Sequence, residues 1–273
     1  MQKTVLITGS SSGIGHATAI YFADRGWNVV ATMRNPEAGT TDLKGRKNID
    51  LVNLDVLDLE SIRSALQFAQ NKFGTIDALV NNAGYAVRGV FEATTSEQTK
   101  RQFDTNVFGL MDVTREVIPV MRRQGHGVIV NVTSIAGKVS SPLHSIYQST
   151  KFAVEGFSES LFYELRSQNI KVKIVEPGVV KTDFYGRSMD RAKTDGLGSY
   201  EAFVEQVSAY DMKLIEKGSS PEVLAECIFD AINDSSWKLR YHAGKYSSMI
   251  LVLRKLLPDR ALMRLVCRAR PDR

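Results

Sequence analysis

Residues 3–15 read Lys3-Thr4-Val5-Leu6-Ile7-Thr8-Gly9-Ser10-Ser11-Ser12-Gly13-Ile14-Gly15. The first six residues are an apolar, β-branched run that predicts a buried strand, and apolar residues then recur at helical spacing as far as Ala23. A second strand is predicted over 28–32. Strand, glycine-rich turn, helix and strand in this order can hold a dinucleotide, with a helix N-terminus facing its pyrophosphate. Because the spacing Gly-x-x-x-Gly-x-Gly departs from Gly-x-Gly-x-x-Gly, a tight turn without a ligand is the alternative.

The same alternation continues along the chain. Further strands are predicted over 49–56, 76–80, 127–133, 172–175 and 238–242, and further helices over 58–69, 96–122, 146–167 and 221–233. Apolar strands that alternate with helices are typical of a parallel sheet covered on both faces. We therefore predict an α/β fold of the Rossmann type, doubly wound, with a seven-stranded parallel sheet and helices on both faces. Ligands bind such sheets at the carboxyl ends of the strands.

Composition narrows the class of protein. The 273 residues are 43% hydrophobic and 24% charged, as in an ordinary soluble globular protein. Cys227 and Cys267 form neither a disulfide framework nor a metal-ligand cluster, so we expect reduced thiols, no metal site and a cytoplasmic location. The net charge of +5 lies in residues 254–273, where seven basic residues oppose two acidic ones. The rest of the chain is neutral, so no nucleic-acid partner is expected.

The end of the second strand bears on the choice of cofactor. An acidic residue there would accept the ribose hydroxyl of NAD, whereas an arginine would pair with the 2′-phosphate of NADP. The sequence is Thr32-Met33-Arg34-Asn35. With one guanidinium and no carboxylate, this stretch favours NADP(H), with NAD(H) as the alternative. If Arg34 were only a solvated loop residue, it would not indicate either cofactor.

Tyr147 and Lys151 stand four residues apart in the helix predicted over 146–167, so their side chains leave the same face. A nearby ammonium group favours the ionised form of a phenol and can lower its pKa by about one to three units. A tyrosine tuned in this way can give or accept a proton near neutral pH. A tyrosine and a lysine that merely share an exposed helix face are the alternative. Asn106 is a second unusual feature, because it lies inside a predicted helix that it weakens.

Together these motifs resemble the short-chain dehydrogenase/reductase family, in its single-domain branch. The similarity spans residues 3–183 and rests on the glycine-rich turn at 8–15, Asp55, Asn81-Asn82-Ala83-Gly84, Asn106, Ser134, Tyr147-x-x-x-Lys151 and Pro177-Gly178 through Thr182. In overall layout, including the basic tail, the chain is most similar to the hydroxysteroid- and retinol-dehydrogenase-like branch. That looser similarity does not fix the substrate.

The resemblance implies four catalytic residues. It implies that Tyr147 donates a proton to a carbonyl oxygen or takes one from an alcohol, and that Ser134 hydrogen-bonds the same oxygen. It further implies that Lys151 lowers the pKa of Tyr147 and binds the nicotinamide ribose. Asn106 would hold a water that connects Lys151 to solvent.

The resemblance also implies a cofactor site. The glycine turn would hold the pyrophosphate, Asp55 would meet the adenine, and Ser11 and Arg34 would take the 2′-phosphate. The expected set is Gly9, Ser11, Ser12, Gly13, Ile14, Gly15, Arg34, Asp55, Val56, Asn82, Ala83, Gly84, Tyr147, Lys151, Pro177, Gly178, Val180 and Thr182. Relatives that prefer NADP often carry a basic residue where this chain has Ser12, so the preference for NADP(H) rests mainly on Arg34.

The resemblance divides the chain into two parts. Residues 1–245 are expected to form a single dinucleotide-binding catalytic domain, with a substrate lid at about 184–215. Residues 246–273 are expected to form a basic amphipathic extension, because Arg260, Arg264 and Arg268 lie opposite an apolar stripe. Such a segment can contact a membrane surface peripherally. Packing on the enzyme body or on a second subunit is favoured over that contact.

We therefore predict an NADP(H)-dependent oxidoreductase that interconverts an alcohol and a ketone or aldehyde. Aromatic and aliphatic residues in the lid, such as Phe184 and Tyr185, favour a lipophilic substrate. A homodimer or homotetramer is expected by analogy. One alternative is an NADP-binding, redox-sensing regulatory protein without catalysis, which the intact set of four catalytic residues disfavours. The other is a sugar-nucleotide epimerase-like enzyme, whose longer substrate domain this chain has little room for.

Overall fold

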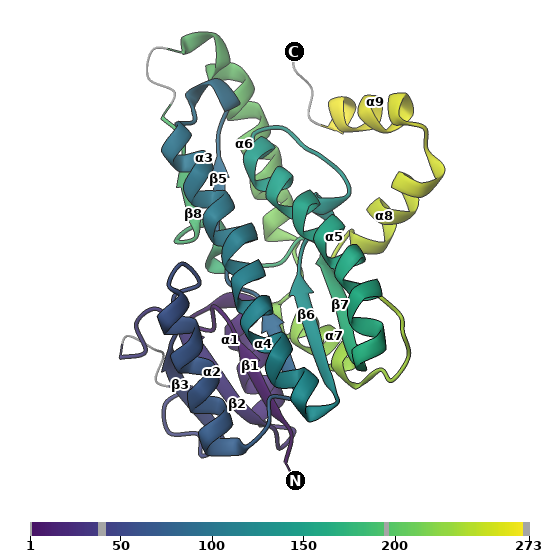
Figure 1. Cartoon of the computed structure of the whole chain (residues 1–273). Helices are drawn as coiled ribbons and strands as arrows, with labels where there is room; N and C mark the ends of the chain where they lie inside the picture. The colour runs from purple at the N-terminus through teal and green to yellow at the C-terminus, as the bar shows by residue number, and fades with distance from the viewer. Residues whose placement is uncertain (1, 38–41, 194–196, 270–273) are drawn as a thin grey trace.

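A seven-stranded parallel sheet forms the centre of the computed structural model, which describes residues 2–37, 42–193 and 197–269 (Figure 1). The strand order is β3-β2-β1-β4-β6-β7-β9. The strands are β1 (Thr4–Ile7), β2 (Asn28–Met33), β3 (Ile49–Asn53), β4 (Ala78–Asn81), β6 (Gly127–Val132), β7 (Ile170–Pro177) and β9 (Arg240–Ala243). The order runs outward from β1 in both directions, which puts the topological switch point between β1 and β4. The predicted doubly wound, seven-stranded sheet is confirmed.

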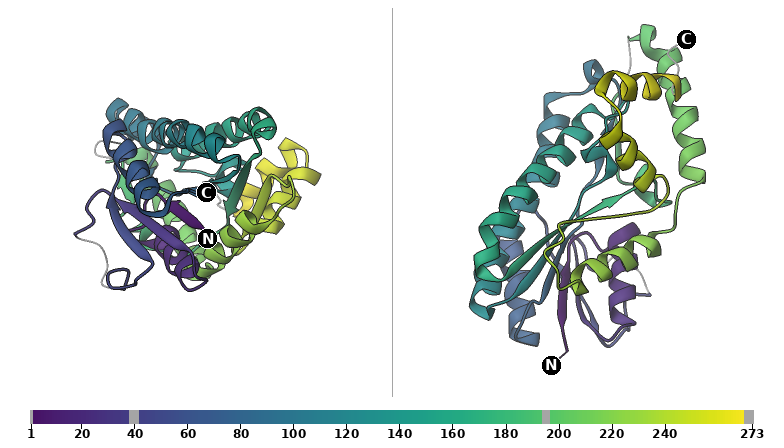
Figure 2. Two further views of the ribbon diagram at one scale, coloured as in Figure 1. Left: turned by 60° about the horizontal axis from the view of Figure 1, so that its bottom comes forward. Right: turned by 90° about the vertical axis from the view of Figure 1, so that its right-hand side faces the viewer.

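Helices cover both faces of the sheet (Figure 2). One face carries α1 (Gly13–Ala23) and α7 (Pro221–Asn233), and the other carries α2 (Leu59–Phe73), α4 (Leu110–Gln124) and α5 (Ser145–Leu165). The alternation of strand side chains divides the core accordingly. Val5 and Ile7 pack with Phe22 of α1, whereas Leu6 packs with Ile62 of α2 on the opposite face.

The helix predicted over 96–122 is not a continuous α-helix. It consists of α3 (Ser96–Phe103), a π-helical segment η2 (Asp104–Gly109) and α4. Thr95 begins α3 with a capping box, in which its side chain and that of Gln98 satisfy each other's backbone N–H groups. Gly109 allows the close approach at the end of η2, because a Cβ atom there would lie 2.7 Å from a methyl carbon of Val56. π-Helical segments such as η2 occur frequently at functional sites.

A second, two-stranded sheet lies beyond the main sheet and was not predicted. It pairs β5 (Ala86–Arg88) with β8 (Met189–Arg191) in parallel. Strands of three residues are too short to reveal a period in the sequence. Short 3₁₀ segments η1 (Phe91–Ala93), η3 (Ile135–Gly137), η4 (Arg166–Gln168), η5 (Asp183–Tyr185) and η6 (Gly198–Tyr200) join these elements, and α6 (Glu201–Glu216) follows η6.

The C-terminal extension forms two helices, α8 (Ser247–Leu256) and α9 (Asp259–Ala269). Ser247 anchors α8 to the sheet, since its Oγ donates a hydrogen bond to the carbonyl oxygen of Glu176 at 3.1 Å. Of the segments discussed above, residues 194–196 of the expected lid and 270–273 of the expected extension lie outside the described residues. None of the helices within the described ranges has both the length and the apolar character needed to cross a membrane.

Candidate functional site

A cavity of about 1330 Å³ opens at the carboxyl ends of the parallel strands. Residues that follow β1, β2, β4, β6 and β7 all contribute to its wall. Its volume exceeds the roughly 300–1,000 Å³ of an ordinary ligand pocket, so it has room for a cofactor and a substrate together. Of the predicted site residues, all line this cavity except Gly15, Asp55 and Asn106.

The turn between β1 and α1 has the backbone of an anion-binding loop. Gly9 and Gly13 have φ angles of +70° and +60°, a region that favours glycine. A Cβ atom on Gly9 would lie 2.8 Å from the Cα atom of Ala83. Ser12 precedes α1 without capping it through its side chain. The first N–H groups of α1 therefore stand at the cavity wall without side-chain caps, where an anion can bind them.

Gly15 serves the packing of this turn and does not line the cavity. A Cβ atom on Gly15 would lie 2.4 Å from both the Asn82 Nδ2 atom and the Gly9 carbonyl oxygen. Asn82 Nδ2 donates hydrogen bonds to the carbonyl oxygens of Thr8 and Gly9, both at 3.0 Å. The backbone N–H of Asn82 donates to Thr8 Oγ1 at 3.0 Å. Asn82 therefore holds the glycine turn in shape from the neighbouring strand.

The residues at the end of β2 bring a guanidinium group to the cavity. Arg34 lines it and its side chain is exposed. Asn53 fixes the backbone at this point, because its Nδ2 donates to the carbonyl oxygen of Arg34 at 2.7 Å. A cationic group here suits a 2′-phosphate better than a free ribose hydroxyl. The geometry is therefore compatible with the predicted preference for NADP(H).

Asp55 lies behind the cavity wall. Its Oδ1 accepts a hydrogen bond from the backbone N–H of Leu57 at 3.0 Å. Val56 and Leu57 line the cavity in its place. The carboxylate shapes the loop after β3, whose Val56 and Leu57 line the cavity. Contact of Asp55 with adenine stays a prediction.

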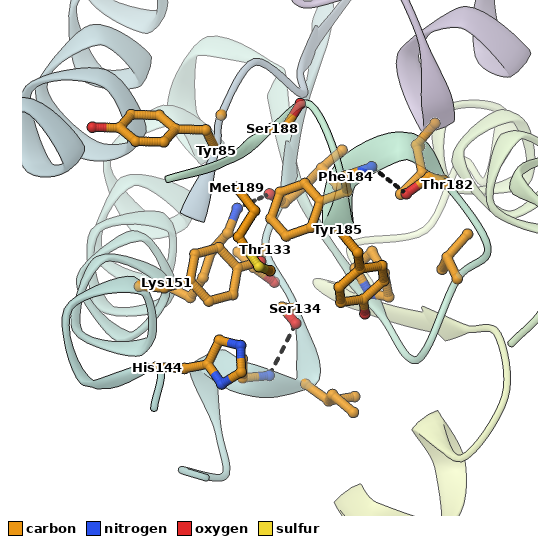
Figure 3. Close-up of a pocket in the computed structure, with 18 of the residues that line it drawn as sticks. Tyr85, Thr133, Ser134, His144, Lys151, Thr182, Phe184, Tyr185, Ser188 and Met189 are labelled. Carbon is orange, nitrogen blue, oxygen red and sulfur yellow. Dashed lines mark hydrogen bonds between the residues drawn. The ribbon is translucent and has the colours of Figure 1, made fainter. Parts of the chain in front are cut away.

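Three of the four predicted catalytic residues, Ser134, Tyr147 and Lys151, line the cavity. Figure 3 shows Ser134 and Lys151 among the residues of the wall. Ser134 follows β6, and its Oγ accepts a hydrogen bond from the backbone N–H of Ala136 at 3.0 Å. Tyr147 and Lys151 come from the first two turns of α5. Lys151 Nζ lies 5.7 Å from the centroid of the Tyr147 ring and donates to the carbonyl oxygen of Val132 at 3.0 Å. The site thus combines a hydroxyl, a phenol and an ammonium group.

The electrostatics of Tyr147 differ from the expectation. Burial raises its pKa, the nearby Tyr185 raises it further, and a hydrogen bond with Ser134 acts in the opposite direction. Burial also lowers the pKa of Lys151 to about 8, which Glu155 partly opposes. The expected lowering of the Tyr147 pKa is therefore not observed, because removal of solvent outweighs any stabilisation of the phenolate by Lys151.

Asn106 lies behind the cavity in the π-helical segment η2, where it is 2% exposed. Its Oδ1 accepts from the backbone N–H of Tyr85 at 3.1 Å, and its Nδ2 donates to the Tyr85 carbonyl oxygen at 2.9 Å. Nδ2 also donates to Thr150 Oγ1 of α5 at 3.2 Å. Asn106 therefore ties the loop after β4 to the helix that carries Tyr147 and Lys151. Its contact with a water that serves Lys151 stays a prediction.

A group of buried charges lies behind the catalytic residues. Glu155, 3% exposed, accepts a hydrogen bond from Thr133 Oγ1 at 2.7 Å and pairs with Lys138 at 2.9 Å and with Arg240 at 3.0 Å. Glu176 of β7 is also buried, and its pKa is raised to about 7 by burial and by Glu155, while Arg240 opposes the shift. The contacts of Glu155 fasten the end of β6 to the third turn of α5.

The segment after β7 completes the wall. Pro177, Gly178, Val180 and Thr182 line the cavity. Thr182 Oγ1 accepts a hydrogen bond from the backbone N–H of Phe184 at 3.3 Å and so begins η5. Phe184 and Tyr185 of η5 then lie beside Ser134 and Lys151 (Figure 3). This segment forms the beginning of the expected lid.

Sequence reasoning missed several cavity residues. Tyr85, Arg101 and Asp190 also line the cavity, where Arg101 pairs with Asp190 and donates to Tyr85 Oη at 3.2 Å. Pairing of β5 with β8 brings these distant segments together, and no motif indicates it. His144 also faces the cavity, with its Nδ1 2.9 Å from the carbonyl oxygen of Pro142.

Comparison with known proteins gives a consistent result. Residues 3–193 match a family model described as short chain dehydrogenase. The uncharacterized oxidoreductase YusZ of Bacillus subtilis is 36% identical over 265 residues, which cover 94% of each chain. A protein of Bacteroides thetaiotaomicron named 3-ketodihydrosphingosine reductase is 32% identical over 265 residues, again covering 94% of each chain.

Solved structures are similar over nearly the whole chain. A short-chain dehydrogenase from Streptomyces avermitilis superposes with a TM-score of 0.83 at 32% identity, covering 97% of this chain and 95% of the other. The structure of ElxO with NADP bound has a TM-score of 0.72 at 28% identity, covering 89% of this chain and 96% of the other. The similarity includes residues beyond the part matched by the family model.

Proposed function

The chain belongs to the short chain dehydrogenase family, and we propose that it is an NADP(H)-dependent oxidoreductase that interconverts a lipophilic alcohol and the corresponding ketone or aldehyde. Membership of the family makes it an oxidoreductase of CH–OH and C=O groups that uses a nicotinamide cofactor. One observation supports the proposed reaction and the preference for NADP(H). Ser134, Tyr147 and Lys151 line the same cavity as the glycine turn and Arg34.

The residues present fit a phosphorylated dinucleotide. Gly9 and Gly13 give the turn its left-handed backbone, and the first N–H groups of α1 stand at the cavity wall without side-chain caps. Arg34 and Ser11 are available for the 2′-phosphate, and Pro177 to Thr182 for the nicotinamide end. ElxO, which was solved with NADP bound, supports this choice at 28% identity. NAD(H) is the second cofactor that the cavity can accept.

The cofactor, when bound, exchanges a hydride with the substrate carbon. In reduction, Tyr147 donates its proton to the substrate oxygen, and its raised pKa keeps the phenol protonated at neutral pH. Ser134 donates a hydrogen bond to the same oxygen and holds it beside Tyr147. Lys151, with a pKa of about 8, is mostly charged at neutral pH and stabilises the negative charge that Tyr147 acquires. Oxidation of an alcohol uses the reverse proton transfer.

The cavity wall supports a lipophilic substrate. Phe184, Tyr185 and Met189 border the catalytic residues, and apolar walls favour apolar ligands. The Bacteroides relative is named 3-ketodihydrosphingosine reductase, and reduction of a keto group is the reaction proposed here. A cytoplasmic location is proposed as well, because Cys227 and Cys267 are free thiols.

Replacement of Tyr147 by Phe tests the proposal. We expect turnover of NADPH with hydrophobic ketones and aldehydes to fall about 10²–10⁴-fold, while NADPH binding, followed by its fluorescence, is retained. Tyr163→Phe is the matched control, because Tyr163 lies on the same helix and is 75% exposed. Equal turnover by Tyr147→Phe and the control would refute the role of Tyr147. Binding of NADPH by the unsubstituted protein without turnover of any carbonyl would instead indicate a regulatory protein.

A homodimer or homotetramer is part of the proposal. In many members of the family the segments that correspond to the helices predicted over 96–122 and 146–167 form the subunit interface. Here these segments carry large exposed side chains, namely Phe108 in η2 and Phe152 and Tyr163 in α5. Partner subunits cover such residues in oligomers. A membrane surface, contacted peripherally through the basic tail, is a less favoured partner than a second subunit.

A further inference from the structure

The two C-terminal helices turn their apolar stripes toward the cavity. On α8 the lining residues are Met249, Ile250 and Leu253, and on α9 they are Leu262, Leu265 and Val266. Within each helix the spacing is that of one helical face. The stripe on α9 was evident in the sequence, but its position at the same cavity as the catalytic residues was not.

The basic residues of the two helices lie away from the cavity. The basic residues of α8 and α9 are Arg254, Lys255, Arg260, Arg264 and Arg268, and none of them lines the cavity. From α6, Leu214 and Ile215 line the cavity at this end, and Tyr210 and Asp211 line it one turn earlier on the helix, where Asp211 pairs with Arg88. All three helices stand at the end of the molecule beyond the carboxyl ends of the strands (Figures 1 and 2). The cavity therefore has an aliphatic end, made by α6, α8 and α9, that continues from its catalytic end.

The aliphatic end of the cavity is partly open to solvent. Leu265 is 44% exposed and Met249 is 55% exposed, although both face the cavity rather than a packed core. Each methylene group buried against such a wall contributes favourably to binding. Since the wall is continuous with Ser134 and Tyr147, a molecule that reacts there can extend its own chain along it.

We propose that α6, α8 and α9 form a channel for an alkyl chain of the substrate, so that the preferred substrate is a carbonyl compound or alcohol with a long, unbranched alkyl chain. This inference rests on the proposed function, because the reacting oxygen is placed at Ser134 and Tyr147. It assigns the C-terminal extension to substrate selection. The basic residues on the opposite side keep the helices hydrated while their apolar sides bind the chain.

Chain-length dependence tests the channel. With 2-alkanones of about six to about sixteen carbons, we expect kcat/KM to rise about two- to fourfold for each added methylene until the channel is filled. Calorimetric binding of unbranched primary alcohols of the same lengths to the NADP-loaded full chain gives a second measurement that needs no turnover. There we expect the dissociation constant to fall about two- to fourfold for each added methylene until the channel is filled.

Neighbouring residues on each helix provide matched controls. Leu253→Trp would block the channel, whereas Val252→Trp changes the adjacent, 51% exposed position that does not line it. Leu262→Ser and Met263→Ser form the corresponding pair on α9, with Met263 68% exposed. We expect the Leu253 and Leu262 variants to lose the preference for long chains, so that kcat/KM no longer rises with each added methylene. The two controls should keep the whole profile.

The experiments distinguish failure of the channel proposal from failure of the proposed function. Reduction of ketones at rates independent of chain length, or equal profiles for each variant and its control, would overturn the channel and leave the proposed function intact. Chain-length-dependent binding of the alcohols without reduction of any ketone would overturn the proposed function and leave the channel. Absence of both binding and reduction would overturn both.

Discussion

The ring of Phe184 lies with its centroid 5.7 Å from that of Tyr147, at an interplanar angle of 56°. Tyr185, the next residue, packs edge-to-face on Phe184 with centroids 5.7 Å apart. Both aromatic residues belong to η5, whose start Thr182 fixes through a hydrogen bond. The phenol proposed as proton donor is therefore shielded by side chains of the expected lid, and burial is the main cause of its raised pKa.

Replacing Phe184 by Ala should weaken the substrate site. Loss of an aromatic contact and of apolar wall area should raise KM for a hydrophobic ketone about tenfold, with a smaller change in kcat. Steady-state kinetics check this result. Phe184→Leu, which keeps apolar volume, should recover most of the loss. Unchanged KM in Phe184→Ala would show that the ring does not contact the substrate.

The pH dependence of reduction should report Lys151. Its pKa is lowered to about 8 in the folded protein, so the charged form is present below that pH and is lost above it. The rate of ketone reduction should therefore fall about tenfold per pH unit at pH values above about 8. Tyr147 does not account for this fall, because its pKa is raised and the phenol stays protonated. A pH–rate profile of kcat provides the measurement.

Glu155 should set the midpoint of that profile. It raises the pKa of Lys151, so Glu155→Gln should move the fall in activity to lower pH. Glu159→Gln is the control, since Glu159 is one turn further along α5, is 51% exposed and pairs only with Arg240 among the ion pairs of the described chain. A midpoint that does not move in Glu155→Gln would show that the decline above pH 8 belongs to another group.

Local sequence patterns predicted much of the fold and site. Strand periodicity and strand-end motifs located the seven-stranded sheet and most of the cavity wall, because Gly9, Ser134 and Tyr147 are positioned by adjacent backbone. What escaped prediction depends on contacts between distant segments. Arg101 reaches Asp190 only after β5 pairs with β8. The pKa of Tyr147 depends on burial by the lid, and the spacing of apolar residues in the sequence does not predict how the lid packs.

Contacts between distant segments also determine the surroundings of single residues inside the motifs, which the sequence does not reveal. Asn106 and Asp55 were assigned roles by position, and the structure adds hydrogen bonds of their side chains with the backbone N–H groups of Tyr85 and Leu57 that the sequence does not reveal. Their contacts with a water and with adenine stay predictions. A motif indicates which residue type a position holds. The direction of its side chain is decided by tertiary packing, such as the π-helical segment around Asn106.

Arg34 should determine the preference between the two cofactors. Replacing it by Ala removes the guanidinium group from the end of β2, so NADPH affinity should fall about ten- to a hundredfold, as expected for a hydrogen-bonded charge. NADH affinity should change little. Fluorescence titration with both cofactors measures the ratio, and Arg46→Ala, which removes a surface partner of Asp24, is the control. Equal losses for NADPH and NADH would mean that Arg34 does not contact a 2′-phosphate.

Glu176 should make the stability of the fold depend on pH. Its pKa rises from 4.5 to about 7 on folding, so between these values the folded state binds more protons than the unfolded state. The penalty for ionising the buried carboxyl is therefore absent below about pH 4.5, grows as pH rises, and is complete above about pH 7. Glu176→Gln removes this penalty, because the amide is neutral at every pH.

Thermal unfolding at about pH 5 and about pH 8 tests this expectation. The variant and the unsubstituted protein should unfold at similar temperatures at the lower pH. At the higher pH the variant should unfold at a temperature higher by at least about 2–4 °C, the change that corresponds to 1 kcal/mol in a domain of this size. Glu159→Gln, an exposed member of the same charge group, should show no such pH-dependent gain. A Glu176→Gln variant that is less stable at the higher pH would mean that the ionised carboxylate and Arg240, 3.5 Å apart, stabilise the fold as a pair.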